Sequence, residues 1–433
     1  MAQAKQFLKF LLSLALRVLI AILVGTLLLT AVYLLPTQPM DDHLAISAAT
    51  FAEEGSYPAL FSWCSSQLDN FTDSIILMNA VYDSGASAPV QAMTGARGYI
   101  EDTVDPCQTL VSHYIDGRAY DSEEPYYQYW HGYLVLVKPL LLLTTYPGIR
   151  VINAIAQAAL LAVLIVLLVK KGRKQYILPY ITAILFLMPL AQAMSLQFSS
   201  CYYILLLGSI ALLAAKDHLP EKEAFLFLYI GIATAYFDFL TYPIATLGIP
   251  AVLYCCLRER MEAKETLFRG VKLCFSWGVG YIGMWAGKWI IGSVITGQNV
   301  LAAASAKIAE RSSTGAVQSG SLVKSIIDTL YANITTFLRT PATLILAVLA
   351  IAALAAVILA IGKHKPTAGV VASSLFPFVI LACLPVIWYM ATTNHSSIHY
   401  WFTCKGLSVS VFAGLCALVK LRDNIEPTHE CNS

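Results

Sequence analysis

Apolar segments alternate along the chain with polar connections, and several of them are long enough to cross a bilayer. The first covers residues 7–35, with Lys5, Lys9 and Arg17 near its start. About 20 consecutive apolar residues are needed to span the hydrocarbon layer. We therefore expect a retained first transmembrane helix whose basic end is cytoplasmic, so that the next segment lies outside the cell or in a lumen.

Nine further apolar segments follow, at residues 150–169, 175–193, 202–215, 224–236, 243–257, 273–295, 341–361, 368–390 and 402–421. Clusters of Lys and Arg fall at every second connection, as expected where cytoplasmic loops carry the positive charge. The pattern predicts an all-α polytopic membrane protein with about ten transmembrane helices and both termini in the cytoplasm. A second outer loop is expected at 297–340, with an amphipathic segment at 300–309.

Acidic residues are concentrated between the first two spans. Residues 36–128 hold fourteen of the 26 Asp and Glu residues, against two basic residues, Arg97 and Arg118. So polar a segment cannot lie in hydrocarbon, and we expect it to form an extracytoplasmic module. The chain then divides into a first transmembrane helix at 1–35, an acidic outer loop with interfacial helices at 36–148, and a multi-span bundle at 149–433.

The outer loop has local patterns of its own. Helical spacing predicts helices at 43–53 and 73–81. The Gly-, Ala- and Ser-rich residues 84–98 are expected to be irregular. The aromatic-rich segment 126–148 is too short for a span, so we expect a helix lying on the membrane surface with its aromatic side chains in the headgroup zone.

Composition agrees with a membrane protein and excludes some functions. The 433 residues are 58% hydrophobic and 12% charged, whereas a soluble domain carries about 25% charged residues. The net charge of +2 and the lack of basic runs with interleaved aromatic residues argue against nucleic-acid binding. Cys64 and Cys107 are the cysteines of the outer loop, and in an oxidising compartment they are predicted to form a disulfide.

Polar clusters that could carry chemistry lie at the outer ends of the predicted spans. A carboxylate near an apolar surface can have a raised pKa and serve as a general base. The catalytic candidates are therefore the acids of the first loop, Asp41, Asp42, Asp69 and Asp73. The simpler roles are a helix N-terminal residue for Asp73 and solvated residues at the membrane exit for Asp41 and Asp42.

A second group of candidates is expected to bind substrate. Asp238 is an ionisable residue in a strongly apolar turn, which by default indicates function. His395 and His399 have i,i+4 spacing and would share one helix face, and Lys405 could help them to neutralise a phosphate; anchoring at the membrane interface is the simpler explanation for all three. The substrate-binding candidates are Trp130, His131, Asp238, Tyr242, Asn394, His395, His399 and Lys405.

A first helix, a large acidic outer loop and a multi-span bundle together resemble the GT-C superfamily of integral-membrane glycosyltransferases. The resemblance implies a lipid-phosphate sugar donor and an acid of the first outer loop as base. Asp41-Asp42 match the acidic pair soon after the first helix, and Asp69 and Asp73 are the rival match, further from that helix. The segment from Asn394 to Trp401, with Lys405 after it, would hold the donor phosphate.

The resemblance implies a specific reaction. A sugar would move from a polyprenyl-phosphate-type lipid to a glycan, lipid or protein acceptor, with inversion, at the outer face of a bacterial plasma membrane. Membrane lipids and the donor are then the expected partners. The resemblance implies no particular cofactor, and the need for a divalent metal is left open.

Three other functions remain open from the sequence. A different envelope-glycan polymerase or ligase would need an outer loop rich in Arg and His, whereas this loop is acidic. A transporter would need polar residues in the middle of its spans, where Lys288 is the exception. A non-catalytic scaffold would tolerate the loss of every acid named above.

Overall fold

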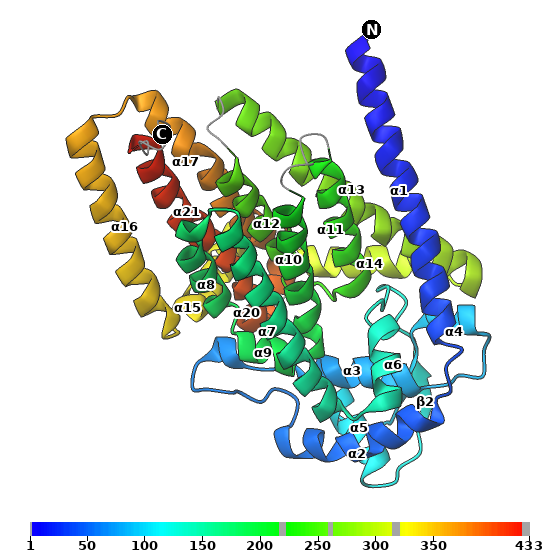
Figure 1. The fold of residues 1–433 in the computed structure, drawn as a ribbon. Coiled ribbons are helices and arrows are strands. Elements are labelled where there is room, and N and C mark those ends of the chain that lie inside the picture. Colours follow the sequence, from blue (N-terminus) through cyan, green and yellow to red (C-terminus); the bar gives the residue numbers. More distant parts are fainter. Residues whose placement is uncertain (1, 216–221, 259–262, 314–320, 427–433) are drawn as a thin grey trace.

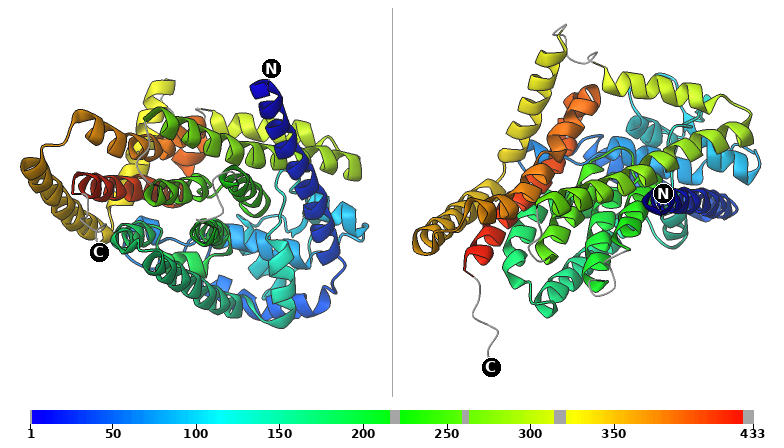
Figure 2. Two further views of the ribbon diagram at one scale, coloured as in Figure 1. Left: turned by 45° about the horizontal axis from the view of Figure 1, so that its top comes forward. Right: turned by 90° about the horizontal axis from the view of Figure 1, so that it is seen from above.

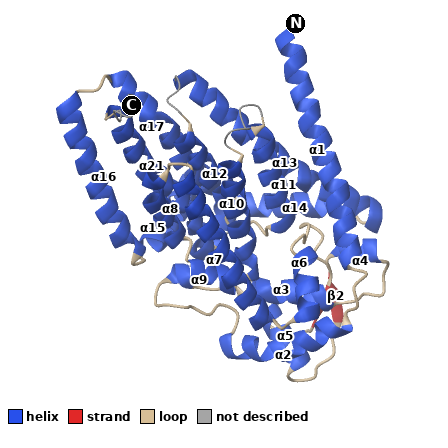
Figure 3. Ribbon diagram, in the orientation of Figure 1, coloured by secondary structure: helices blue, strands red, loops and turns tan. Residues whose placement is uncertain are grey.

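The computed structural model describes residues 2–215, 222–258, 263–313 and 321–426. Figure 3 shows that most of this chain is helical. The N-terminal part contains α1 (Ala2–Val32), α2 (Gln38–Glu54), η1 (Cys64–Ser66), α3 (Asn70–Val81), α4 (Ala88–Thr94), β1 (Arg97–Tyr99), α5 (Pro106–Tyr114), β2 (Ser122–Glu124) and α6 (Leu134–Leu143).

The rest of the described chain forms the bundle. Its elements are α7 (Tyr146–Lys170), η2 (Lys174–Tyr176), α8 (Ile177–Phe186), α9 (Pro189–Met194), α10 (Leu196–Ala214), α11 (Glu223–Phe237), α12 (Ile244–Leu257), α13 (Ala263–Thr296), α14 (Val300–Ser312), α15 (Leu322–Leu338), α16 (Ala342–His364), α17 (Ala368–Ala382), α18 (Leu384–Ala391), α19 (Thr393–Ile398), α20 (Tyr400–Thr403), η4 (Cys404–Leu407) and α21 (Ser408–Ile425).

Figure 1 shows two levels in the molecule. Helices α2, α3, α5 and α6 form a module at one end, and the long helices extend from it to the end where both termini lie. The two views of Figure 2 place α1 and α16 at opposite edges of the bundle. The acidic segment 36–128 and the apolar helices therefore form different layers of one molecule.

Six helical segments in the described chain are long and apolar enough to cross a membrane. They are Ala4–Val32, Tyr146–Lys170, Leu196–Ala214, Ala342–His364, Ala368–Ala391 and Tyr400–Ile425. The expected count of about ten also included α8, α11, α12 and α13. The first three have only 10, 15 and 14 residues, and α13 carries Arg269, Lys272 and Lys288. The chain thus has the build of a helical membrane protein.

Glycines allow α13 to approach its neighbours closely. A Cβ atom at Gly231 of α11 would lie 2.1 Å from the carbonyl oxygen of Trp277, and one at Gly280 would lie 2.3 Å from that of Leu228. On another face, a Cβ at Gly287 would lie 2.4 Å from Ile22 of α1. Small residues permit such contacts between helix backbones, and they fix the position of the aromatic residues further along α13.

The local predictions for the outer loop are confirmed in part. The helices expected at 43–53 and 73–81 are α2 and α3, and the amphipathic segment at 300–309 is α14. Each helix has a residue that favours its start. Pro39 lies in the first turn of α2. Before α3, the Asp69 side chain accepts a hydrogen bond from Thr72 N, and before α14 the Asn299 side chain accepts one from Ala302 N. Side-chain acceptors of this kind satisfy backbone donors that a helix start leaves unpaired. Residues 314–320 of the second outer loop lie outside the described residues.

The segment 84–98 is not irregular as predicted. It contains α4 and the strand β1, which pairs antiparallel with β2 so that Arg97 faces Glu124 and Tyr99 faces Ser122. Gly95 adopts φ +58° directly after α4. A glycine in this left-handed conformation is a usual helix C-terminal residue, so part of the small-residue content ends a helix.

The aromatic cluster of 126–148 does not lie in a headgroup zone. Tyr129, Trp130 and Tyr133 are buried, and the helical parts of the segment are α6 (Leu134–Leu143) and the first residues of α7. Trp130 Nε1 donates to Met284 O at 2.7 Å, which attaches the segment to α13. The prediction was wrong because it took amphipathic aromatic residues for surface anchors when the bundle covers them.

Cys64 and Cys107 are not joined by a disulfide. Cys107 is buried in α5, with its sulfur 3.8 Å from Phe51 O of α2. Cys64 is exposed in η1, on the side of the module where η1 meets α20. The two thiols therefore face different neighbours, a difference that their spacing in the sequence does not reveal.

Candidate functional site

A cavity of about 340 Å³ lies between α13, α14 and the segments before α6 and after α18. We call it the outer cavity. Tyr129, Tyr281, Trp285 and Trp289 supply aromatic walls, and Lys307 and Arg311 of α14 supply positive charge. Ile282 and Ile308, which also line it, are 68% and 51% exposed, so the cavity borders the side of the bundle that faces the surroundings. It therefore combines an apolar approach, aromatic walls and two cations.

Arg311 is held in place by α19. Its guanidinium donates to His395 Nδ1, and His395 Nε2 lies 2.8 Å from Leu240 O. This pair of contacts assigns the proton to Nε2. Burial, with the charges of His399 and Arg311, holds the pKa of His395 well below its ordinary value. Asn394 Nδ2 donates to Glu310 O at 2.7 Å, so His395 and Asn394 position the helix end that carries Arg311.

A series of aromatic contacts connects Arg311 with the acidic module. The ring of His395 lies 4.8 Å from that of His399, His399 lies 5.2 Å from Trp401, and Trp401 lies 5.5 Å from Tyr57, measured between centroids. Tyr57 lies within electrostatic range of Asp69. We call this series the ring path.

Several buried polar atoms at the cavity and along the ring path have no hydrogen-bond partner among the described residues. They are Arg311 Nε, His399 Nδ1 and Trp401 Nε1. Burial lowers the pKa of His399 to about 3, so its ring is neutral and Nδ1 can accept or donate according to tautomer. Most buried polar groups in native proteins are paired, so these three atoms are available to hydrogen-bond a ligand or water.

Asp69 lies at the acidic end of the ring path. Its carboxylate accepts from Thr72 N at 2.9 Å, and the side chain is buried. Burial raises the pKa of Asp69 to about 7, with a further contribution from the nearby charge of Asp73. A carboxylate with a pKa near neutrality can both take up and release a proton under physiological conditions.

Asp73 is also buried, but its carboxylate is fully occupied. It accepts from Tyr146 Oη at 2.6 Å, Leu196 N at 2.8 Å, Gln197 N at 3.0 Å and Ser195 Oγ at 3.2 Å. Two of these donors are backbone groups at the start of α10, so Asp73 caps a helix that is distant in sequence. Burial raises the pKa of Asp73, and the donors together with Arg150 oppose that rise.

Arg150 completes a network around Asp73. Its guanidinium pairs with both oxygens of Glu54, at 2.6 and 2.8 Å, and also contacts Asn70 Oδ1 and Tyr146 Oη. Asn70 Nδ2 in turn donates to Glu54 at 2.9 Å. We call these five residues the Arg150 cluster: Glu54, Asn70, Asp73, Tyr146 and Arg150.

Asp41 and Asp42 lie elsewhere in the module. Asp41 accepts a hydrogen bond from Tyr114 Oη and lines a separate cavity of about 300 Å³ with Asp83, Tyr82 and Tyr120. Asp42 accepts from Gln38 Nε2 at 2.9 Å on the exposed side of α2. Neither residue lines the outer cavity.

Asp238 and Tyr242 lie in the turn that borders the outer cavity. Asp238 accepts from Thr241 N at 3.0 Å, and burial raises its pKa to about 6. Its charge acts on Tyr129 and Tyr281, which line the cavity. The hydroxyl of Tyr242 contacts the Gln192 side chain of α9 and Phe198 O of α10, which attaches the turn to both helices.

Trp130, His131 and Lys405 have internal partners. Both ring nitrogens of His131 are within 2.7 Å of oxygen atoms, Tyr133 Oη and Tyr126 O, and burial with the charge of Lys288 lowers the pKa of His131 to about 3. Lys405 Nζ donates to Ser65 O at 2.8 Å and lies 4.8 Å from the centre of the Phe198 ring. The contacts of His131 are within its own segment, whereas those of Lys405 with Ser65 and of Trp130 with Met284 attach the module to the bundle.

The residues that sequence reasoning missed are Lys307, Arg311 and Arg150. Lys307 and Arg311 do have a local signal, since i,i+4 spacing in an amphipathic segment puts both on one helix face. Arg150 was treated only as the start of a span. No cluster of three or more His, Cys, Asp or Glu side chains suited to a metal occurs within the described ranges.

Comparison of the whole chain with protein-family models, with curated proteins and with solved structures found no match.

Proposed function

We propose that the protein transfers a sugar from a lipid-phosphate donor to an acceptor at the outer face of a bacterial plasma membrane. The observation that carries the proposal is the outer cavity, where Arg311 and aromatic walls meet an exposed apolar border. A sugar attached to a lipid phosphate has an apolar chain, a negative linkage and a polar head. The cavity offers a matching group for each.

The proposal includes a topology. Ten spans are expected, with α8, α11, α12 and α13 added to the six long apolar helices and with both termini in the cytoplasm. The module of α2–α6 and the helix α14 would then lie outside. Helix α14 has Val300 and Ala304 buried while Leu301 and Ile308 are exposed, a distribution that suits a helix at a membrane surface.

Arg311 would hold the donor phosphate, and Lys307, whose Nζ pairs with Glu310 at 2.7 Å, would add a second positive charge beside it. Arginine binds phosphate through two parallel N–H···O bonds and lysine as a point charge, and Arg311 Nε has no partner among the described residues. The indole and phenol rings of Trp285, Trp289 and Tyr129 would contact the sugar or the first isoprene units. His395 acts as a positioning residue for Arg311.

Asp69 is the base in this proposal. It does not line the outer cavity, so the mechanism requires the acceptor hydroxyl to come within hydrogen-bond distance of Asp69 when the donor binds. The acceptor oxygen attacks the anomeric carbon, its proton passes to the Asp69 carboxylate, and the sugar–phosphate C–O bond breaks so that the lipid phosphate leaves with the electron pair. Attack opposite the leaving group inverts the anomeric centre. Asp73 fits this role less well, because four donors already surround its carboxylate.

The test is sugar transfer by the purified full-length protein in vesicles, with a radiolabelled polyprenyl-phosphate sugar. Asp69→Asn should lower turnover by about 10²–10⁴-fold, the usual contribution of a general base, and leave donor binding unchanged. Asp42→Asn, an exposed residue of the same loop, is the matched control. If no sugar–lipid of this class is consumed by the wild-type protein, or if Asp69→Asn transfers at the wild-type rate, the proposal is wrong.

A further inference from the structure

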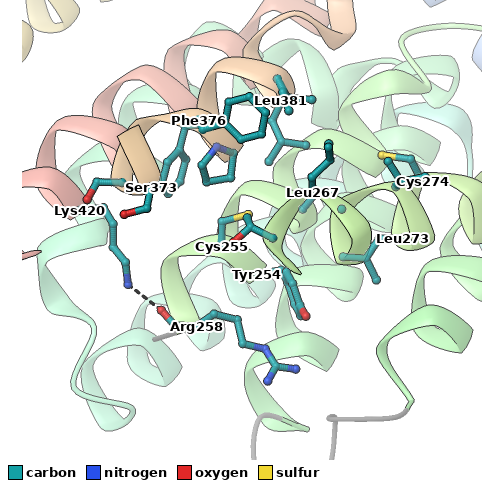
Figure 4. A pocket seen from close by; sticks show the side chains of 18 of the residues that line it. Tyr254, Cys255, Arg258, Leu267, Leu273, Cys274, Ser373, Phe376, Leu381 and Lys420 are labelled. Atoms are coloured by element: carbon teal, nitrogen blue, oxygen red, sulfur yellow. Dashed lines mark hydrogen bonds between the residues drawn. The ribbon is translucent and has the colours of Figure 1, made fainter. Parts of the chain in front are cut away.

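A second cavity, of about 280 Å³, lies between α12, α13, α17 and α21. We call it the inner cavity, because it is near the C-terminal ends of α12 and α21, opposite the module of α2–α6 (Figure 1). Figure 4 shows apolar side chains such as Phe376, Leu381 and Leu267 on one side and Lys420, Arg258 and Tyr254 on the other. The cavity is therefore amphipathic.

The inner cavity opens to the side of the bundle. Leu267, Phe275 and Phe376 line it and are 42%, 46% and 40% exposed. These large apolar side chains would face hydrocarbon in a bilayer. A lipid chain could enter between α13 and α17 without passing through water.

Positive charge prevails at the polar end. Arg258 and Arg269 share one acid, Glu223, each at 3.2 Å, and Arg269 also pairs with Glu265. Lys420 Nζ donates to Arg258 O at 2.6 Å, which uses one of its three N–H groups. Arg173 and Asp423 also act electrostatically on Lys420. Within the described part of the chain, four cations therefore stand against three acids, and one positive charge remains.

We propose that the inner cavity binds an anionic phospholipid of the surrounding bilayer. The phosphodiester contacts Lys420 and Arg258, and the upper part of one acyl chain packs on Leu267 and Phe376. Basic pockets between transmembrane helices on the cytoplasmic side bind such headgroups. The volume is below the range for a whole drug-sized ligand, so most of the lipid remains in the bilayer. This site is independent of sugar transfer.

Gly270 offers a direct way to block the cavity. It lines the cavity, and a Cβ atom there would meet nothing within 4 Å. Gly270→Phe should fill the space, and because a mid-helix glycine is unfavourable, the replacement should not disturb α13. Gly414→Phe is the matched control, since Gly414 of α21 has equally open space and lies outside both cavities.

The experiment measures thermal unfolding of the full-length protein in neutral detergent with added phosphatidylglycerol or phosphatidylcholine of the same chains. Phosphatidylglycerol should raise the Tm of the wild type and of Gly414→Phe more than phosphatidylcholine does. Gly270→Phe should lose this difference. Gly270→Leu fills less space and serves if the larger variant does not fold.

Lys420→Gln tests the headgroup contact with the cavity left open. Its affinity for phosphatidylglycerol should fall about fivefold, as expected for one lysine near a lipid phosphate, and its response to phosphatidylcholine should not change. Equal responses of the wild type to both lipids would overturn the proposal, as would an unchanged response in the Gly270 variants. Displacement of phosphatidylglycerol by a polyprenyl phosphate at equal concentration would assign the cavity to the donor chain instead.

Discussion

Two clusters lie close to the module of α2–α6, one around the buried Arg150 and one around the half-buried Arg311, and they differ in how completely their polar atoms are paired. In the Arg150 cluster, the carboxylates of Glu54 and Asp73 and the guanidinium of Arg150 have partners on every side. Around Arg311, by contrast, Arg311 Nε, His399 Nδ1 and Trp401 Nε1 have no partner among the described residues. No buried side-chain atom of the first cluster lacks a partner, whereas three atoms of the second do.

The difference teaches that a buried charge does not by itself mark a functional site. Asp73 and Arg150 are costly to bury, but the desolvation is compensated within the fold. They connect α2, α3, α7 and the start of α10, which makes them an attachment point between module and bundle. Arg311 has a single described side-chain acceptor, His395, and its remaining donors are suited to a ligand.

The largest expected effect is that of Arg150→Leu, which tests whether the Arg150 cluster stabilises the fold. The change leaves the Glu54 carboxylate without its cation and removes a donor from Tyr146. Breaking a buried ion pair from one side costs about 3–5 kcal/mol, so the free energy of unfolding should fall by that amount. Thermal unfolding of the purified protein in detergent measures it.

The control for this change is Arg118→Leu. Arg118 is exposed and donates to Glu101 O at 3.1 Å, and its replacement should alter stability by less than about 0.5 kcal/mol. Equal losses in the two variants would mean that the Arg150 cluster is not the attachment that its hydrogen bonds indicate.

What the sequence could predict of these clusters depended on the distance between partners along the chain. Helices α2, α3 and α14 were recognisable because periodicity and capping are local. The pairing of Asp73 with residues 195–197 was not, since those donors lie far along the chain. Asp73 and Asp42 consequently ranked as bases on charge and position alone.

The same limit applies to the cations. His395, His399 and Lys405 come from one stretch, and a shared role in binding phosphate was expected for all three. The structure assigns Lys405 to Ser65 O and His395 to Arg311, so partners from η1 and α14 decide what each can do. Burial of Trp130 was likewise invisible, because its partner Met284 lies far along the chain in α13.

A second, smaller effect is expected for Arg311→Gln. Hydrogen bonds to charged groups contribute about 1.5–3 kcal/mol, so the affinity for a polyprenyl phosphate should fall by roughly 10–150-fold, with little change in Tm. Binding to the purified protein is measured directly, without turnover. Lys324→Gln, on the exposed side of α15, is the control and should bind as the wild type does.

A marked loss of stability in Arg311→Gln would break the comparison. It would mean that Arg311 belongs to the framework in the same way as Arg150. Unchanged affinity in a normally stable variant would instead remove Arg311 from the proposed phosphate site.

The smallest effect concerns Asp69, which lies between the two clusters and whose charge is opposed by burial. Its folded pKa of about 7 exceeds the value of about 3.9 expected for an unfolded Asp. Between these values the folded state retains a proton that the unfolded state has released, so the contribution of Asp69 makes stability fall as the pH rises. Between pH 5.5 and 6.5 the fall should be about 1 kcal/mol, since one pKa unit corresponds to about 1.4 kcal/mol.

Asp69→Asn cannot titrate, so the difference in unfolding free energy between pH 5.5 and 6.5 should be smaller in this variant than in the wild type by that amount. Asp42→Asn should keep the wild-type dependence.

Turnover should respond in the opposite sense, because a base must be ionised: the rate should rise as the pH increases through about 7. A wild-type rate that is flat from pH 6 to 8, with an unchanged stability slope in Asp69→Asn, would show that Asp69 is already ionised. Asp69 would then be a helix-capping residue like Asp73, and it would belong with the fully paired Arg150 cluster rather than with the residues around Arg311.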